Sequence, residues 1–395
     1  MSNFYERAAK LGHSRELLEK GVAIQSRIVV ENVEQLRELL DLGLNKEGRE
    51  KLVEEMFEGI PTPPGDTAAG LLNRVEKYLY GNAELSHETR RLIESLFPMT
   101  ISADSNPNET ISTKYLLTSP DSVYVKNWGT LTLADGGCLI ANSKGVQITI
   151  EKLIRTGKAP QPYSDINILG TTGAAGATGG TGGTGGQGDK GKDGYCSSGG
   201  IAGPGGENGK TGGQGIVGGT GGTGSDGSPS QLATIEIFSF GSTGTISVAT
   251  RSGTGGAGGK GGTGGRGGTG GKGGNGVTCA CTGNGAGSGA RGGTGGTGGR
   301  GGQGGNAVAA AANVVIRVPA QNISQIFPLS APVPPGSGGP AGVAGAGGPG
   351  GGGGSGGKYN GNASGGSTGA GGVTGTGGTG GTQSGAAAKI NIEPL

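Results

Sequence analysis

The sequence predicts a multidomain protein whose parts follow one another along the chain. We expect an N-terminal α-helical domain over residues 1–98 and a small β region over 99–169. A C-terminal bundle of six polyglycine type II helices with β-strand connections is expected over 170–395. Three observations predict this fold class: capped helical spacing in the first part, alternating apolar residues in the second, and glycine at every third position in the third.

Composition separates the two halves of the chain. Glycine supplies 98 of the 395 residues, against an average near 7%. Hydrophobic residues make up 31% of the chain and concentrate before Leu169. The second half therefore lacks the side chains for an apolar core, and any order there must come from backbone hydrogen bonds.

The first 97 residues or so have the spacing and caps of short helices. Apolar residues recur at helical spacing, and prolines interrupt or end the pattern at Pro61 and Pro98. We expect a docking or oligomerisation module here. The predicted helices are Val33–Leu40 capped by Asn32, Lys46–Phe57 preceded by Asn45, Thr67–Tyr80 capped by Asp66, and His87–Phe97 capped by Ser86.

Residues 99–169 change to a period of two. Val123 and Val125, Leu131 and Leu133, and later Ile148 and Ile150 alternate with other residues, and a turn is expected at 135–137, where the sequence is Asp-Gly-Gly. This pattern predicts a short antiparallel sheet or β-roll that joins the helices to the glycine-rich part.

Glycine then falls on every third position in six separate segments, here called runs one to six. Runs three and four have the denser Gly-Gly-X form. The runs are Gly170–Gly194, Gly200–Gly227, Gly253–Gly276, Gly289–Gly305, Gly336–Gly357 and Gly366–Gly381.

Three interpretations of these runs compete. Collagen requires one long register and much more proline than the runs contain. A flexible linker has no reason to keep phase through eight or nine triplets. Packed polyglycine type II helices explain the spacing best. Such a helix has three residues per turn, so a Gly-X-X run has one bare face that lets neighbouring backbones bond laterally. On this logic runs three and four are central, and runs one and two lie at an edge.

Segments between the runs predict three hairpins. Short connections follow runs one, three and five, whereas strand-like segments such as 234–238 and 314–318 separate the pairs, and a further one, 389–392, closes the chain. We therefore expect the three short tips to share one end and the strands to form a base. At about 3.1 Å per residue, a run of 25 residues would project its tip by roughly 75 Å.

Residues on the predicted tips are the candidate recognition site. Loops on a rigid scaffold often carry binding residues, and tyrosine and asparagine combine a flat surface with hydrogen-bonding groups. The same residues are also common turn formers, and the sequence leaves both interpretations open. The candidates are Tyr195, Lys358, Tyr359, Asn360 and Asn362.

Three of the four cysteines also fall on tips. A disulfide from Cys196 to Cys279 or to Cys281 would join two hairpins; free thiols are the alternative, and a zinc site would need a fourth ligand. Cys138 is expected to be a buried strand residue. We predict no metal and no cofactor.

Two ladders of side chains recur at three-residue spacing. They could bind a polysaccharide or ice, but the interspersed charges favour a solvated face that keeps the glycine region soluble. The ladders are Lys260, Thr263, Arg266, Thr269 and Lys272 in run three, and Thr294, Thr297, Arg300 and Gln303 in run four.

No pattern indicates an enzyme. The two histidines, His13 and His87, both lie in predicted helices, so no catalytic residue is proposed. The net charge of +2 predicts no nucleic-acid partner. No apolar run suggests membrane insertion, and charged residues among the first 20 exclude a Sec-type signal peptide. We expect the protein to be extracellular or associated with a virion or similar particle. It would reach this location by a route other than the Sec pathway.

Across Gly170 to Gly381, the layout resembles the polyglycine-sandwich adhesins at the tail-fibre tips of T-even-type bacteriophages. The glycine-rich antifreeze protein of snow fleas is similar in packing. The resemblance covers about half of the chain and does not include the first 169 residues. It implies a non-enzymatic adhesin that binds a cell-surface glycan or protein receptor with its tips, and we expect the N-terminal helices to dock it. The tips of this chain are short, unlike those of the phage adhesins. The alternative is a self-assembling filament or matrix protein, with itself as partner; an ice-binding protein or a toxin is less favoured.

Overall fold

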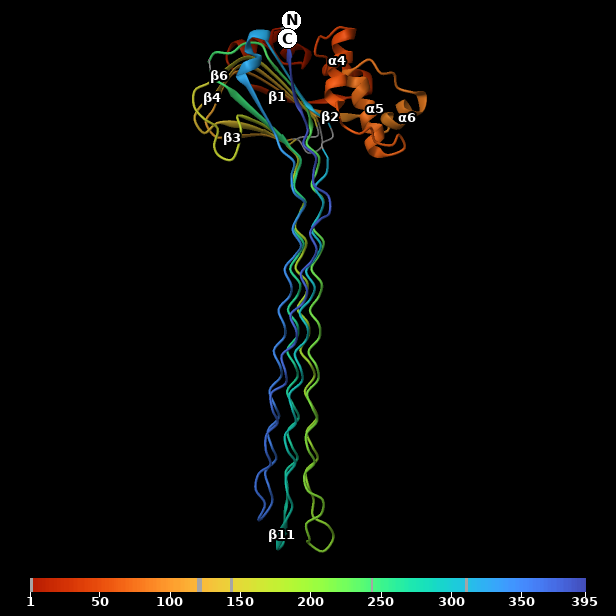
Figure 1. Ribbon diagram of the computed structural model, residues 1–395, viewed down its shortest axis with the longest axis vertical. Helices are drawn as coiled ribbons and strands as arrows, with labels where there is room; N and C mark the ends of the chain where they lie inside the picture. The colour runs from red at the N-terminus through yellow and green to blue at the C-terminus, as the bar shows by residue number, and fades with distance from the viewer. Residues whose placement is uncertain (1–2, 119–122, 143–144, 243, 310–311) are drawn as a thin grey trace.

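The computed structural model describes residues 3–118, 123–142, 145–242, 244–309 and 312–395. It has a head, made of helices and strands, and a long glycine shaft made of runs one to six (Figure 1). The predicted fold class is wrong. The described residues form mostly an α/β structure with a seven-stranded mixed sheet and a five-stranded parallel sheet, not a helical domain followed by a small β region.

Most predicted helices are present. Asn32, Asn45 and Ser86 cap them through side-chain oxygens, as expected. The cap predicted at Asp66 is one residue early, because Thr67 accepts the hydrogen bond from the backbone of Gly70. The described helices are α1 (Phe4–Lys10), α2 (Arg15–Glu19), α3 (Val33–Leu39), α4 (Lys46–Phe57), α5 (Ala68–Tyr80), α6 (His87–Glu94) and the 3₁₀ helix η1 (Ala320–Gln325).

A strand that the sequence analysis missed joins the helical segment to the sheet. Strand β1 (Ile24–Val30) pairs antiparallel with β2 (Met99–Ile111), so the helices and the larger sheet are parts of one head. Six of its seven residues are half-buried or exposed in alternation, and only Val30 is buried. This short alternating pattern lies between capped helices, which is why the segment was predicted to be helical.

The remaining strands of the head pair in parallel. This overturns the predicted antiparallel sheet. The turn at Asp135-Gly136-Gly137 leads from β4 (Tyr124–Leu133) in the larger sheet to β5 (Cys138–Ala141) in the smaller one instead of closing a hairpin. An apolar alternation reports which face is buried, but it does not report the direction of the partner strand.

The chain therefore alternates between the two sheets. The larger sheet has the order β1-β2-β4-β6-β8-β12-β14, and the smaller has the order β13-β9-β7-β5-β3. Their strands are β3 (Lys114–Leu117), β4 (Tyr124–Leu133), β5 (Cys138–Ala141), β6 (Gly145–Arg155), β7 (Ile166–Leu169), β8 (Leu232–Ile237), β9 (Ile246–Arg251), β12 (Val314–Val318), β13 (Ile326–Ser330) and β14 (Ile390–Pro394).

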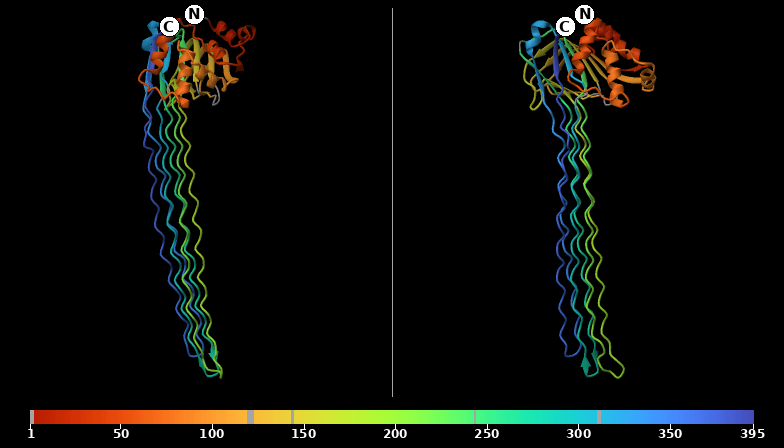
Figure 2. Two further views of the ribbon diagram at one scale, coloured as in Figure 1. Left: turned by 90° about the vertical axis from the view of Figure 1, so that its right-hand side faces the viewer. Right: turned by 45° about the vertical axis from the view of Figure 1, so that its right-hand side comes forward.

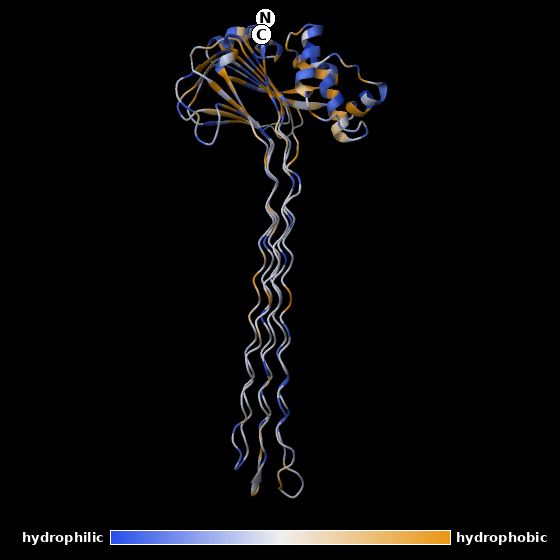
Figure 3. Cartoon of the chain, in the orientation of Figure 1, coloured by the Kyte–Doolittle hydropathy of each residue, from blue (hydrophilic) through white to orange (hydrophobic). Residues whose placement is uncertain are grey.

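Two apolar cores hold the head together. The first lies between the sheets and includes Trp128, Ile148 and Ile235, all fully buried. The second lies on the other face of the larger sheet, beneath α3, α4 and α5, and includes Leu36, Met56 and Val125. Orange, hydrophobic ribbon is accordingly concentrated in the head, whereas the shaft is largely pale (Figure 3).

The shaft is held by backbone hydrogen bonds with a three-residue period. Gly173 N–H donates to Thr254 at 2.9 Å, Gly176 to Ala257 at 2.8 Å and Gly179 to Lys260 at 2.8 Å. The same step continues along the other runs, as the glycine spacing predicts. Neighbouring runs keep side by side along the shaft in all views (Figure 2).

The runs form two layers that continue the two sheets. Runs one, three and five leave β7, β9 and β13 of the smaller sheet, and runs two, four and six return to β8, β12 and β14 of the larger sheet. Runs three and four each exchange hydrogen bonds with four other runs, which confirms their predicted central position. Runs one and two lie together at one edge, also as predicted.

Contact between the runs requires glycine at most of the repeated positions. A Cβ atom on Gly262 would lie 2.0 Å from the carbonyl oxygen of Gly180, whereas one on Gly371, at the outer edge of run six, would meet backbone only at 3.8 Å. A methyl group at Gly262 would therefore force two runs apart.

We expect Gly262→Ala to lower the free energy of unfolding by about 1–3 kcal/mol, because it overpacks the space between two backbones. The matched control, Gly371→Ala, should be neutral or stabilising by about 0.4–1 kcal/mol, since alanine restricts the unfolded chain. Calorimetry of the full chain measures both. Equal effects of the two substitutions would contradict the steric account.

Burial also makes the stability of the head depend on pH. Glu76 in α5 is 8% exposed, and desolvation raises its pKa from 4.5 to about 7. The folded state thus binds this proton more tightly than the unfolded state. The resulting stabilisation is fully present below pH 4.5 and is lost as the pH rises through about 7.

We therefore expect the wild-type head to lose up to about 3 kcal/mol more stability than Glu76→Gln over this pH interval. Glutamine keeps the shape of the side chain but cannot ionise. Denaturant titrations of both proteins at the two ends of the interval provide the comparison. Parallel pH profiles would show that Glu76 does not couple folding to protonation.

Candidate functional site

Three tips meet at the end of the shaft that lies farthest from the head and from both termini (Figure 1). They are residues 195–202, which follow run one and include the first residues of run two, 277–284 between runs three and four, and 358–362 between runs five and six. The middle tip is a hairpin of two short strands, β10 (Thr278–Cys279) and β11 (Thr282–Gly283).

A disulfide joins the first two tips. Of the two pairings that the sequence left open, the structure has Cys196–Cys279, with 5.7 Å between the Cα atoms. Cys281 is a free and exposed thiol. Cys138 is fully buried in β5, as predicted, and burial raises the pKa of its thiol.

The side chain of Asn284 connects the same two tips by hydrogen bonds. Its side-chain NH₂ group donates to the carbonyl oxygens of Pro204 at 2.8 Å and Gly203 at 3.2 Å, and its side-chain oxygen accepts from the Val277 N–H at 2.6 Å. The side chain is buried, at 8% exposure. This residue was not predicted from the sequence. The available signal was an asparagine three residues after Cys281 and five residues before run four.

The third tip is attached by polar contacts. Thr278 Oγ1 accepts from the Lys358 N–H at 2.9 Å, and the Asn360 side chain donates to the carbonyl oxygens of Gly283 at 2.9 Å and Lys358 at 3.0 Å. Asn362 accepts from the Gly356 N–H at 3.2 Å. In this structure, both asparagines shape the turn.

Aromatic and apolar side chains remain exposed on this fixed base. Tyr195 is 60% exposed, Tyr359 is 84% exposed, and Ile201, which the sequence analysis did not single out, is 63% exposed. The Lys358 ammonium lies 5.1 Å from the centre of the Tyr359 ring. Tyr359 has a φ of 69°, a left-handed conformation that is costly outside glycine and asparagine.

The two side-chain ladders lie on opposite faces of the shaft. The ladder of run three belongs to the layer of runs one, three and five, and that of run four to the layer of runs two, four and six. Most of their side chains are exposed, including Lys260, Arg266 and Arg300. They are not brought together with the tip residues.

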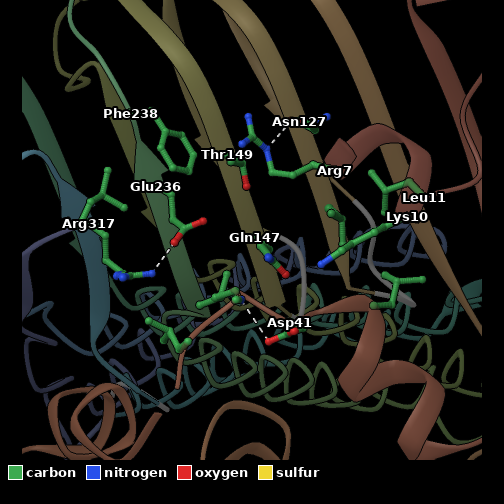
Figure 4. A pocket seen from close by; sticks show the side chains of 16 residues that line it. Arg7, Lys10, Leu11, Asp41, Asn127, Gln147, Thr149, Glu236, Phe238 and Arg317 are labelled. Atoms are coloured by element: carbon green, nitrogen blue, oxygen red, sulfur yellow. Dashed lines mark hydrogen bonds and ion pairs between the residues drawn. The ribbon is translucent and has the colours of Figure 1, made fainter. Parts of the chain in front are cut away.

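The head contains a second candidate site, a cavity of about 350 Å³ on the outer face of the larger sheet (Figure 4). Strand register places Asn127, Thr149, Glu236 and Arg317 side by side across four adjacent strands to form its floor. Helix α1 and residues 39–44 complete the cavity.

Charges in this cavity are largely paired. Arg317 contacts Glu236 at 2.5 Å, and Arg7 contacts Glu151 at 2.7 Å and lies 4.7 Å from the centre of the Phe238 ring. Burial raises the pKa of Glu236, and the nearby Arg317 guanidinium opposes this effect.

The polar residues of this floor were not predicted from the sequence to form a site. A signal was present, because Glu236, Arg317 and Glu393 are each the single charged residue of a strand that follows a glycine run. Parallel register aligns Glu236 with Arg317 and Arg317 with Glu393. Charges at matching strand positions thus indicated a polar row across the sheet.

No family model, curated protein or solved structure matches this chain. Within the described ranges, no three histidine, cysteine, aspartate or glutamate side chains come together as a metal site. None of the helices in those ranges is long and apolar enough to cross a membrane.

We expect Asn284→Ala to loosen the first two tips, because it leaves the carbonyl oxygens of Gly203 and Pro204 and the Val277 N–H without this partner. Local protection should fall by about 1–3 kcal/mol, which corresponds to roughly tenfold to a hundredfold faster amide exchange. Hydrogen exchange of peptides covering 195–204 and 277–284 measures it. Asn208→Ala, which removes a single contact to the Ser288 N–H at 2.7 Å, is the matched control.

Proposed function

We propose that the protein is a non-enzymatic adhesin, a structural protein that presents its tips to a receptor on a cell surface. The observation that carries this proposal is the exposure of Tyr195, Ile201 and Tyr359 on tips that are tied to one another at the far end of the shaft. Large exposed side chains on a fixed base are typical of binding surfaces.

Rigidity of the tips supports binding. The disulfide, Asn284 and Asn360 together connect all three tips. A surface that is ordered before binding loses less conformational entropy when it meets its partner. The Tyr359 backbone, held in a left-handed conformation, is consistent with a side chain whose position matters.

The receptor is proposed to be a cell-surface glycan or protein. Tyrosine rings stack on sugar or peptide surfaces, and the exposed Lys358 and backbone carbonyls add polar contacts. The disulfide at the tip favours an oxidising setting, outside a cell or on a particle. In this proposal the helices of the head dock onto the particle or cell that carries the protein.

Self-assembly into a filament is the second candidate function. The outer edge of run six favours it, because Gly371 and Gly377 are exposed there and have no side chain to keep another backbone away. Such an edge resembles the open edge of a β-sheet, which is prone to pairing with another chain.

We expect Tyr195→Ala and Tyr359→Ala each to weaken receptor binding by about tenfold, since a truncated aromatic anchor typically costs more than 1 kcal/mol. Binding of fluorescently labelled protein to a printed glycan panel and to cultured cells provides the measurement. Val373→Ala, on the shaft and 69% exposed, is the control and should bind normally.

Unchanged binding by both tyrosine variants would contradict the adhesin proposal. Electron microscopy of the same preparations tests whether the protein assembles into filaments. Discrete particles are expected for an adhesin, whereas open-ended filaments that persist in both tyrosine variants would favour self-assembly.

A further inference from the structure

The cavity in the head has features of a ligand site that the proposed receptor-binding function does not use. It lies at the opposite end of the molecule from the tips (Figure 1). Its floor is a row of side chains that the parallel register holds in place, so its shape does not depend on a mobile loop. Its volume of about 350 Å³ is within the usual range for small-molecule sites.

Two buried polar atoms in this floor have no partner among the described residues. They are the side-chain oxygen of Gln147, a residue only 6% exposed, and the Nε atom of Arg317. Leaving a buried polar group unpaired is costly. Gln147 requires a donor and Arg317 requires an acceptor, so a molecule that carries both kinds of group would satisfy the floor.

Among the charged side chains that line the cavity, one has no ion pair with another described side chain. Arg317 is paired with Glu236, Arg7 with Glu151, and Asp41 with Arg49. Lys10, at the end of α1, has no ion pair among the described residues, and Figure 4 shows its side chain reaching toward Gln147. The cavity therefore favours a ligand with one negative charge.

Apolar side chains make up the rest of the wall. Leu11, Leu44 and Phe238 line the cavity beside the polar floor. A phenyl ring next to polar groups is a suitable surface for the C–H face of a sugar ring or a short carbon skeleton. A purely inorganic anion would leave this surface without contacts.

We propose that this cavity binds a small hydroxylated carboxylate, of the size and chemistry of a uronic acid. The carboxylate accepts from Lys10 and a hydroxyl group donates to Gln147. A second hydroxyl oxygen, at the far end of the molecule, accepts from Arg317 Nε, and the carbon skeleton contacts Phe238 and the leucines. The occupant is a free monosaccharide acid or the end of an acidic saccharide chain.

Isothermal titration calorimetry of the full chain tests this proposal with three probes. Glucuronate has the carboxylate and the hydroxyl groups, glucose lacks the carboxylate, and acetate lacks the hydroxyl groups. We expect measurable binding of glucuronate only, together with an increase in the thermal unfolding temperature as its concentration rises. Equal binding of glucose or of acetate, or no binding of glucuronate at millimolar concentration, would overturn the proposal.

Two variants locate the site. Lys10→Met and Gln147→Leu should each weaken glucuronate binding by about tenfold or more, while Lys20→Met, a lysine of the head paired with Glu16 outside the cavity, should bind as the wild type does. Lys10 is exposed, so its substitution leaves the fold intact even if Gln147→Leu does not. Unaltered affinity of Lys10→Met would place any binding elsewhere. An oligoglucuronate probe distinguishes a chain end from the free acid, since only a cavity open to a chain binds both.

Discussion

One hydrogen bond, repeated at every third residue, determines the form of the shaft. A glycine N–H donates to a carbonyl of the neighbouring run, and the absence of a Cβ atom allows the two backbones to come close enough. Isolated extended runs of this kind have no internal hydrogen bonds. Because runs three and four each bond to four others, the order of any run depends on all of its neighbours, and a single hairpin alone would lack most of its partners.

The head supplies the arrangement in which these bonds can form. Strands β7, β9 and β13 are neighbours in one sheet, and β8, β12 and β14 are neighbours in the other. Each hairpin leaves from the first set and returns to the second, so the sheets place the runs in two layers before any glycine contact is made. At the far end, the disulfide and Asn284 hold the tips together. The shaft is thus fixed at both ends, which supports the proposed binding role of its tips.

The sequence predicted what short-range patterns encode. Asn32 and Ser86 were identified as caps because a cap depends on a few adjacent residues, and the central position of runs three and four followed from their density of glycine. Strand direction, the partner of β1 and the polar row of Thr149, Glu236 and Arg317 depend on residues many positions apart. Among the tip residues, the turn-forming asparagines and the exposed tyrosines were all found, whereas Asn284 and Ile201 were not. Their roles depend on three hairpins meeting in space.

The fixed register between the runs limits which insertions and deletions the shaft can accept. Hydrogen bonds from run one to run three join residues 81 positions apart along the whole length, for example Gly173 with Thr254 and Gly191 with Lys272. Loss of one triplet from a single run would move its tip by one turn of the extended helix. Backbone groups of the adjoining runs would then lack a hydrogen-bond partner at that level. A longer or shorter shaft therefore requires matched insertions or deletions in all six runs. Exposed tip side chains such as Tyr195, Ile201 and Tyr359 can change without altering the runs, whereas the residues that join the tips must change together.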